Sequence, residues 1–590
     1  MRISPLILRI ICRVELAFVM ATVFVLASCT ELKRPEPNPY LSETQAPQEQ
    51  EFRWSNGGKP KSVDPAKAET APETDIVRAL FEGLTDVDPE TLEAVPGVAE
   101  KWYSSEDNKI WTFEFREDAK WSNGKPVTAF DFVRSWQRLL DPKLMSAHKN
   151  LLENISRVPT SSSTQKTEGS TQSTAIETGD PADVDLSESA ETETAAANLP
   201  DSGDKAKFDV TATNHRTLVV KLEKPDRNFP NLVAHPIFLP VFGSANRPVS
   251  LKADKHVITN GAFKIEKTDG DALELARSET YWNHEKVRIE RVVFVPVASP
   301  DEALEAYRNG KVDAVTNAEF APLAQKMFTP YADFRKSVYA ALNFYEINHT
   351  KPPFNDRRIR EALAISIERE KLSNAELEGT TRPALSFLPF ATESQTKIVQ
   401  DKERARELFE QAGFADGRGF PVVKLVINRN ETQQRVAREV MKMWKTALNI
   451  ETDLVVKEND QIDEARSKLD YDVLRRNVVF QVADELAGIS AIHQPETSFE
   501  SNKNDRTEGA KSQTPVPARP DNSTAQPTQS SLQDLPILSE ETAIHEMHAI
   551  PLYFPMSFSL VKPYVSGFEM NMIGAQSFLQ IAIDSDWQPR

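Results

Sequence analysis

The stretch from Phe81 to Trp136 constrains the fold of this chain more than any other segment. Three aromatic residues alternate with polar neighbours, with the period of a half-buried strand: Trp111, Phe113 and Phe115. A Ser-Asn-Gly turn follows at 122–124, where the glycine can take a positive φ. Thr128 then predicts a helix N-terminus, with Asp131 completing a capping box. Local physics therefore predicts a strand, a turn and a helix within a mixed α/β protein.

Residues 1–28 have the form of a bacterial lipoprotein signal peptide. Arginines come first, and the apolar run from Leu16 to Leu26 is too short to span a bilayer as a stable anchor. Leu26-Ala27-Ser28-Cys29 has the form of a lipobox, which predicts a lipid on the Cys29 thiol. The alternative is an ordinary secretory signal that happens to contain a cysteine. Residues 29–51 lack periodicity and are predicted to be a lipidated tether.

Charge and composition exclude several classes of protein. The net charge of −18, from 70 basic and 88 acidic residues, argues against nucleic acid or anionic membrane surfaces as partners. The length of 590 residues predicts several domains. Cys12 would leave with the signal peptide, so the mature chain is predicted to have no disulfide. Two polar segments are predicted to be disordered: 160–204, with ten acidic residues and one lysine, and the Pro-rich 498–534.

Other segments predict further helices and strands. Residues 263–277 have a hairpin pattern around Asp269-Gly270-Asp271. Residues 403–414 predict an amphipathic helix that ends at Gly413. Residues 422–456 predict strand, helix and strand, an order that implies parallel pairing with a right-handed crossover.

The order and spacing of these motifs resemble those of the extracytoplasmic solute-binding proteins of the peptide/nickel family, family 5, which serve ABC importers. The likeness is strongest to its oligopeptide-binding members. The segments that carry it include Pro96-Gly97-Val98-Ala99-Glu100, Trp121-Ser122-Asn123-Gly124, Tyr281-Trp282-Asn283 and Asn343 to Leu363. The resemblance implies an α/β fold: a two-lobed periplasmic-binding-protein fold of type II, with an extra inserted subdomain and mixed β-sheets flanked by helices.

The resemblance also implies a division of the chain. Lobe I would be discontinuous, comprising 52–81, 208–338 and 556–590. Subdomain II would be inserted at 82–207 and would contain the acidic segment 160–204. Lobe III would span 339–555 and would contain the Pro-rich segment 498–534.

By resemblance, a ligand would lie in the cleft between the lobes. Ala71 would offer its backbone to a bound peptide as an added strand, with Glu69 flanking the ligand. The alternative for both residues is a plain surface turn. Tyr345 would line the cleft, although an aromatic residue on such a strand is more often part of the core.

Charged groups would hold the two ends of the ligand. Arg466 and Arg475 fall where the oligopeptide binders have arginines in the cleft, and a guanidinium can hold a carboxylate bidentately. The alternative is that both make surface ion pairs with neighbours such as Asp463 or Asp470.

The site expected for the α-amino group departs from the family pattern. Aligned without a gap, the aspartate of the oligopeptide binders corresponds to Gln481, and the nearest acid is Asp484, three residues later. Asp484 is therefore the candidate amine ligand. Residues 485–548 also lack the family pattern, which returns at 549.

No catalytic constellation is found in the sequence. There is no Gly-Xaa-Ser-Xaa-Gly elbow and no phosphate loop, and no enzyme activity or cofactor is predicted. His545 and His548 stand three apart and could meet one metal ion, but no third ligand is evident, so no metal site is predicted.

The predicted function is that of a monomeric lipoprotein in the periplasm or cell envelope, anchored to a membrane by lipid. It would capture oligopeptides and deliver them to an ABC transporter permease. One alternative is a degenerate binding protein that acts as a sensory or interaction lipoprotein, with a non-peptide ligand or none. The reasons for this alternative are the altered amine site and the lack of the family pattern in residues 485–548. A second alternative, a peptidase built on a binding scaffold, lacks a nucleophile or metal set.

Overall fold

The structure is a computed structural model that describes residues 39–588, apart from 43–44, 145, 147, 160–206, 244–254, 270, 391–395, 494–536 and 570. The predicted signal peptide, Cys29 and the two segments predicted to be disordered lie outside the described residues. Within the described part of the chain, no helix combines the length and apolar character needed to cross a bilayer.

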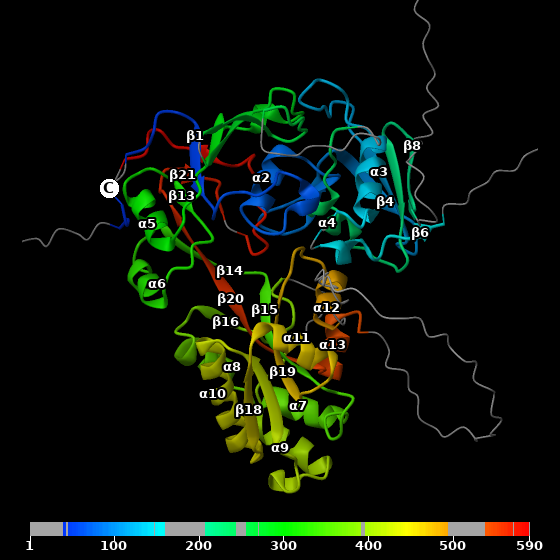
Figure 1. Cartoon of the computed structure of the whole chain (residues 1–590), viewed down its shortest axis with the longest axis vertical. Helices are drawn as coiled ribbons and strands as arrows, with labels where there is room; N and C mark the ends of the chain where they lie inside the picture. The colour runs from blue at the N-terminus through cyan, green and yellow to red at the C-terminus, as the bar shows by residue number, and fades with distance from the viewer. Residues whose placement is uncertain are drawn as a thin grey trace, which may run out of the picture.

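Two bodies are joined by one long strand, β20 (Ala549–Val561) (Figure 1). We call the described residues up to 338 and from 562 onward the upper body, and residues 339–548 the lower lobe. The upper part of β20 pairs with β13 (Ala314–Val315) and β14 (Phe334–Val338). Its lower part pairs with β15 (Ala341–Ile347) and β16 (Thr381–Pro383). A single 12-stranded sheet therefore runs through both bodies. Ten strands follow the order β10-β11-β12-β1-β13-β20-β15-β19-β17-β18, and β14 and β16 each pair with β20 outside this row.

The upper body contains one end of this sheet and a smaller sheet beside it. The large sheet contributes β1 (Glu51–Ser55), β10 (Phe263–Asp269), β11 (Ala272–Arg277) and β12 (Arg291–Phe294). Helices α2 (Glu73–Leu80), α5 (Pro300–Arg308) and α6 (Pro322–Phe328) accompany it. The short pairs are β2 (Thr85–Val87) with β3 (Ala94–Pro96), β6 (Arg157–Val158) with β7 (Lys207–Phe208), and β21 (Val565–Ser566) with β22 (Ala582–Ile583).

The smaller sheet confirms the local prediction for residues 111–136. Its strand order is β4 (Ala99–Ser104), β5 (Ile110–Phe115), β9 (Thr217–Lys221) and β8 (Val210–Asn214). The three alternating aromatic residues of β5 are all buried: Trp111, Phe113 and Phe115. Helix α3 (Ala129–Gln137) begins after Thr128, and both hydrogen bonds of the capping box with Asp131 are present. A four-residue helix, α4 (Phe229–Leu232), lies nearby.

The lower lobe confirms the predicted strand–helix–strand unit. Strands β17 (Val423–Asn428) and β18 (Thr452–Lys457) pair in parallel, connected by α10 (Glu431–Leu448), and β19 (Val473–Val479) lies between β17 and β15. The remaining helices are α7 (Arg357–Ile365), α8 (Arg369–Lys371), α9 (Lys402–Gln411), α11 (Asn459–Ser467), α12 (Glu485–His493) and α13 (Glu540–Glu546).

The N-terminal residues that the structure describes are not a free tether. The Leu41 N–H donates to the Asp333 carboxylate at 2.9 Å. The Tyr40 ring packs edge-on against Trp587, with centroids 5.5 Å apart. The Ser42 hydroxyl contacts the buried ammonium of Lys562. The globular part therefore begins before β1, because individual polar and aromatic contacts can fix a segment that has no periodicity.

Candidate functional site

The two bodies interlock at the surface between them. Val482 belongs to the lower lobe but is buried in the hydrophobic cluster of the upper body. In return, Val87, Leu92 and Ala234 from the upper body are buried in the hydrophobic cluster of the lower lobe. Residues on both sides of this junction are the candidates for contacting a ligand held between the bodies.

The turn that contains Glu69 and Ala71 leads into α2 and leaves backbone groups open. Ala71 is partly exposed, and its N–H makes no hydrogen bond with any described residue. Its carbonyl oxygen accepts only a weak bond from the Thr70 hydroxyl, at 3.3 Å. The Glu69 carbonyl oxygen lies 3.0 Å from His148 Nε2. An unpaired amide of this kind is what an added strand would use.

Arg475 is the centre of a polar cluster at the end of the lower sheet. Its guanidinium donates to the side-chain oxygens of Asn343 at 2.5 Å, Asn477 at 3.0 Å and Asn428 at 3.4 Å. Its Nε is buried without a hydrogen-bond partner. Among the described residues no carboxylate pairs with Arg475, and burial lowers its pKa. The ion pairs named as alternatives for Arg475, with Asp463 or Asp470, are not formed.

The surroundings of Arg475 favour an anion. Asn428 ends β17, and α10 begins three residues later, so the positive end of that helix dipole lies next to the cluster. Gln433 in the first turn of α10 donates to the Tyr553 hydroxyl at 2.9 Å. Sequence reasoning missed Asn343, Gln433 and Tyr553, because isolated amides and a tyrosine on a strand carry no motif.

Arg466 has a carboxylate partner within the lobe. Its Nε lies 3.2 Å from Glu346, which also accepts from Arg476 at 2.7 Å and from the Tyr471 hydroxyl at 2.5 Å. Burial acts to raise the pKa of Glu346, but Arg476, Tyr471 and Arg466 together hold this pKa below its usual value. Arg466 therefore has Glu346 on β15 as a carboxylate partner, and no ion pair with the alternatives Asp463 or Asp470 is among its described contacts.

Tyr345 lies in the core of the lower lobe. It is 1% exposed and packs against Trp444 of α10, with ring centroids 6.3 Å apart. Its hydroxyl has no hydrogen-bond partner, and burial raises its pKa. Tyr345 was expected either to line the cleft or to belong to the core, and its burial agrees with the core.

Asp484 begins α12 and faces the upper body. One carboxylate oxygen caps the helix by accepting from the Ala487 N–H at 2.6 Å. The buried Oδ2 has no hydrogen bond of good geometry among the described residues, and the nearby Asn228 side chain acts to lower the pKa of this carboxyl group. Burial raises the pKa of Asp484 to about 6. Across from it, burial and the charge of Asp484 raise the pKa of Asp226 to about 7. Asp226 was also missed from sequence, since a lone aspartate in a loop has no pattern.

Asp484 and Asp226 line a cavity of about 270 Å³ between α12 and two loops of the upper body, 150–154 and 223–232. None of the other five predicted site residues lines this cavity: Glu69, Ala71, Tyr345, Arg466 and Arg475. The structure therefore distributes the predicted residues over several places rather than one pocket.

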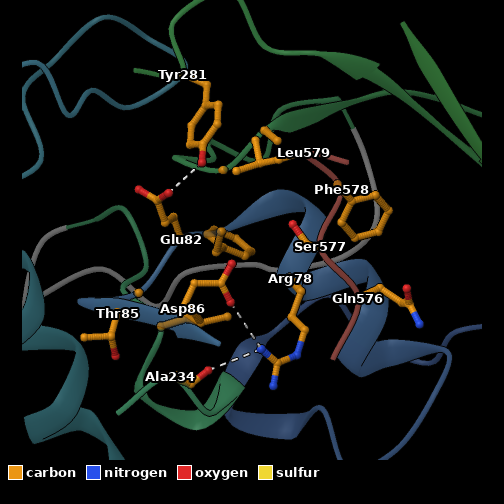
Figure 2. A pocket seen from close by; sticks show the side chains of 15 residues that line it. Arg78, Glu82, Thr85, Asp86, Ala234, Tyr281, Gln576, Ser577, Phe578 and Leu579 are labelled. Carbon is orange, nitrogen blue, oxygen red and sulfur yellow. Dashed lines mark hydrogen bonds and ion pairs between the residues drawn. The ribbon is translucent and has the colours of Figure 1, made fainter. Parts of the chain in front are cut away.

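A second group of charged side chains lies in the upper body, around a cavity of only about 40 Å³. Figure 2 shows Arg78 of α2 directed toward Asp86, at 4.0 Å, and the Ala234 carbonyl, at 3.3 Å. The Glu82 carboxylate turns the other way and accepts from the Tyr281 hydroxyl at 2.6 Å. Burial raises the pKa of Glu82 to about 7. This cavity is too small for a peptide, and its charges join α2 to the β2–β3 hairpin.

The buried acids are expected to make the stability of the folded protein depend on pH. Burial is the first cause of a raised pKa in four carboxyl groups: Asp75, Glu82 and Asp226, each to about 7, and Asp484, to about 6. The folded protein holds these protons where the unfolded chain, with carboxyl pKa values near 4, releases them. Their contribution to stability is therefore complete below about pH 4 and is lost as pH rises through 6 to 7.

The four acids are expected to raise the melting temperature of the ligand-free protein at about pH 5.5 relative to about pH 8, whereas His235, His493 and His548, whose pKa burial lowers, act in the opposite direction. Differential scanning calorimetry measures both melting temperatures, and Glu82→Gln should reduce this contribution of the acids. An unchanged pH dependence of the melting temperature in Glu82→Gln would contradict the burial of Glu82.

The two histidines of the His545–His548 pair lie in different surroundings. His545 is exposed and bonds to Glu546, whereas the His548 ring stacks on His349 with centroids 3.8 Å apart. Within the described ranges, no group of three or more His, Cys, Asp or Glu is arranged to hold a metal ion.

Comparison with known proteins agrees with this architecture. A profile of the bacterial extracellular solute-binding proteins, family 5, matches residues 93–498. The periplasmic oligopeptide-binding protein OppA of Escherichia coli is 30% identical over 531 residues, covering 87% of this chain and 89% of that protein. The periplasmic murein peptide-binding protein MppA of E. coli is 31% identical over 439 residues, covering 71% and 73%.

Solved structures share the fold. The unliganded open form of the murein tripeptide-binding protein MppA matches with a TM-score of 0.67 and 25% identity, covering 92% of this chain and 99% of that one. Haemophilus influenzae OppA in complex with the peptide RPPGFSPFR matches with a TM-score of 0.52 and 24% identity, covering 91% and 100%. The predicted two-lobed fold is confirmed. The chain belongs to family 5 of the bacterial extracellular solute-binding proteins.

Proposed function

We propose that this protein captures oligopeptides between its upper body and lower lobe and delivers them to an ABC importer. The observation that carries the proposal is Arg475, a partly buried cation whose described partners are three asparagine oxygens and no carboxylate. A buried unpaired charge is costly to the folded protein, so a site of this kind is suited to receive a ligand carboxylate.

The other contacts fit a peptide backbone. The free N–H of Ala71 would pair with the peptide as an added strand, with Glu69 beside it. Such main-chain pairing gives affinity without selecting side chains. Arg466 would act indirectly, since its bond to Glu346 helps to hold β15, the strand that also carries Asn343. Tyr345, buried beneath the cluster, would support the position of Arg475.

The relatives support the same assignment. OppA and MppA of E. coli carry names that describe periplasmic binding of oligopeptides and murein peptides. The lipobox at Cys29 would attach this chain to a membrane in the cell envelope, where it would act as a monomer with an ABC permease. No catalytic step, cofactor or metal is part of the proposal.

A thermal-shift experiment tests the proposal. The chain expressed from residue 30 keeps every described residue. Short peptides with free termini should raise its melting temperature in proportion to the logarithm of their concentration, because they bind only the folded state. The same peptides with acetylated and amidated ends serve as controls. No shift from any free peptide would contradict the proposal.

One observation favours a second candidate, a sensory or interaction lipoprotein that does not deliver peptides. Gln481 stands where a gap-free alignment places the amine-binding aspartate, and Asp484 is used in part as a helix cap. A protein that binds no peptide in the thermal-shift experiment but retains a stable fold would support this candidate.

A further inference from the structure

The cavity between α12 and the upper body has an acidic lining that peptide capture does not by itself require. Four of its residues are acids: Glu153, Glu223, Asp226 and Asp484. The one basic residue of the lining, Lys224, is exposed. At about 270 Å³ the cavity is far larger than a water-sized void, so it can admit a side chain.

Two of these acids are buried and come from opposite bodies. Asp484 is 1% exposed and Asp226 is 6% exposed. Asp226 is positioned by its own backbone: its carbonyl accepts from Trp111 Nε1 at 3.0 Å, and its Oδ1 accepts from the Asn228 N–H at 2.9 Å. Neither carboxylate has a described cationic partner.

One oxygen of Asp484 has no hydrogen bond of good geometry among the described residues, although the Asn228 side chain is close enough to hold down the pKa of this carboxyl group. This oxygen, Oδ2, is buried, whereas the other oxygen already caps α12. Two buried carboxylates that face one another repel, and a positive charge between them would relieve both the repulsion and the missing hydrogen bond. An ammonium or guanidinium group has several donors and could bridge the two acids.

We propose that this cavity receives a positively charged side chain of the bound peptide, held between Asp484 of the lower lobe and Asp226 of the upper body. Asp226 is then a residue that determines specificity, favouring peptides that contain lysine or arginine. Because the two acids lie on different bodies, the same contact would draw α12 and the upper body together. The inference rests on the proposed peptide capture and adds a preference that capture alone does not demand.

Isothermal titration of the chain from residue 30 tests the inference with tetrapeptides that differ only in lysine or norleucine at one position, with each position tested in turn. Norleucine keeps most of the apolar length of lysine and removes its charge. The protein is expected to bind the best lysine peptide about tenfold or more tightly than its norleucine partner. Asp226→Asn should abolish this difference.

A matched control is Asp118→Asn, which makes the same charge change at an exposed residue of the upper body outside the cavity. It should retain the lysine preference. Equal binding of both peptides by the unmodified protein would overturn the inference while leaving peptide capture intact. An undiminished preference for the lysine peptide in Asp226→Asn would also overturn the inference, because the acid pair would then be a structural contact only. Failure of every peptide to bind would instead contradict the proposed function itself.

Discussion

Replacing Arg475 with methionine is expected to lower the affinity for a peptide with a free carboxylate by about 2 kcal/mol or more, which is about 30-fold. Charge-assisted bonds to a carboxylate are among the strongest polar contacts, and Arg475 has no described acid that would compete for it. Stability should not fall, because methionine fills similar space and removes a partly buried unpaired cation.

Isothermal titration with a free peptide and its C-terminal amide separates this contact from general effects. The unmodified protein should prefer the free carboxylate, and Arg475→Met should bind both forms equally weakly. Arg429→Met is the control. It removes the same charge two residues before α10, but its side chain is 68% exposed and pairs with Glu458. If Arg475→Met retained the preference for the free carboxylate, the ligand end would have to lie elsewhere.

Glu346→Ala is expected to destabilise the lower lobe by about 3–5 kcal/mol. The carboxylate is the shared acceptor for Arg466, Arg476 and Tyr471, and the two arginine side chains are only 14% and 8% exposed. Its removal leaves those donors short of an acceptor in a place where water cannot easily replace it. Glu346→Gln should cost less, since an amide oxygen still accepts hydrogen bonds.

Urea unfolding followed by tryptophan fluorescence measures this loss. Trp444 is buried and is the one tryptophan of the lower lobe, so its fluorescence reports the unfolding of this lobe. The tryptophans of the upper body can stay in place where the Trp444 signal is resolved from theirs. Glu464→Ala is a matched control, because Glu464 forms an exposed pair with Lys468 on α11 and should cost about 0–1 kcal/mol. Equal losses in the two variants would mean that Glu346 does not hold this part of the lobe together.

Regular elements of this fold could be predicted from sequence where one face is buried. The alternation of Trp111, Phe113 and Phe115 and the capping box at Thr128 are each determined by local rules, and both are present. The parallel pair β17–β18 followed from the order of strand, helix and strand. The N-terminal contacts of Tyr40 and Leu41 could not be predicted, because their partners Trp587 and Asp333 lie hundreds of residues away.

The site was harder to predict because it is built from single residues on separate elements. Arg475 and Arg466 look alike in sequence, yet one faces asparagine oxygens and the other pairs with Glu346 on a neighbouring strand. Asp226 and Asp484 are 258 residues apart, from their numbers in the chain, and become neighbours only when the two bodies meet. Such pairings depend on tertiary packing, which no local pattern records.

Native mass spectrometry of the chain purified from residue 30 tests the central claim most directly. If the protein captures oligopeptides between its two bodies, the freshly purified chain should carry a mixture of short peptides, which leave on mild denaturation and can be sequenced. After their removal, a free peptide should bind one to one, and Arg475→Met should bind it more weakly. A chain that emerges without peptide and stays empty when peptides are added would contradict the account.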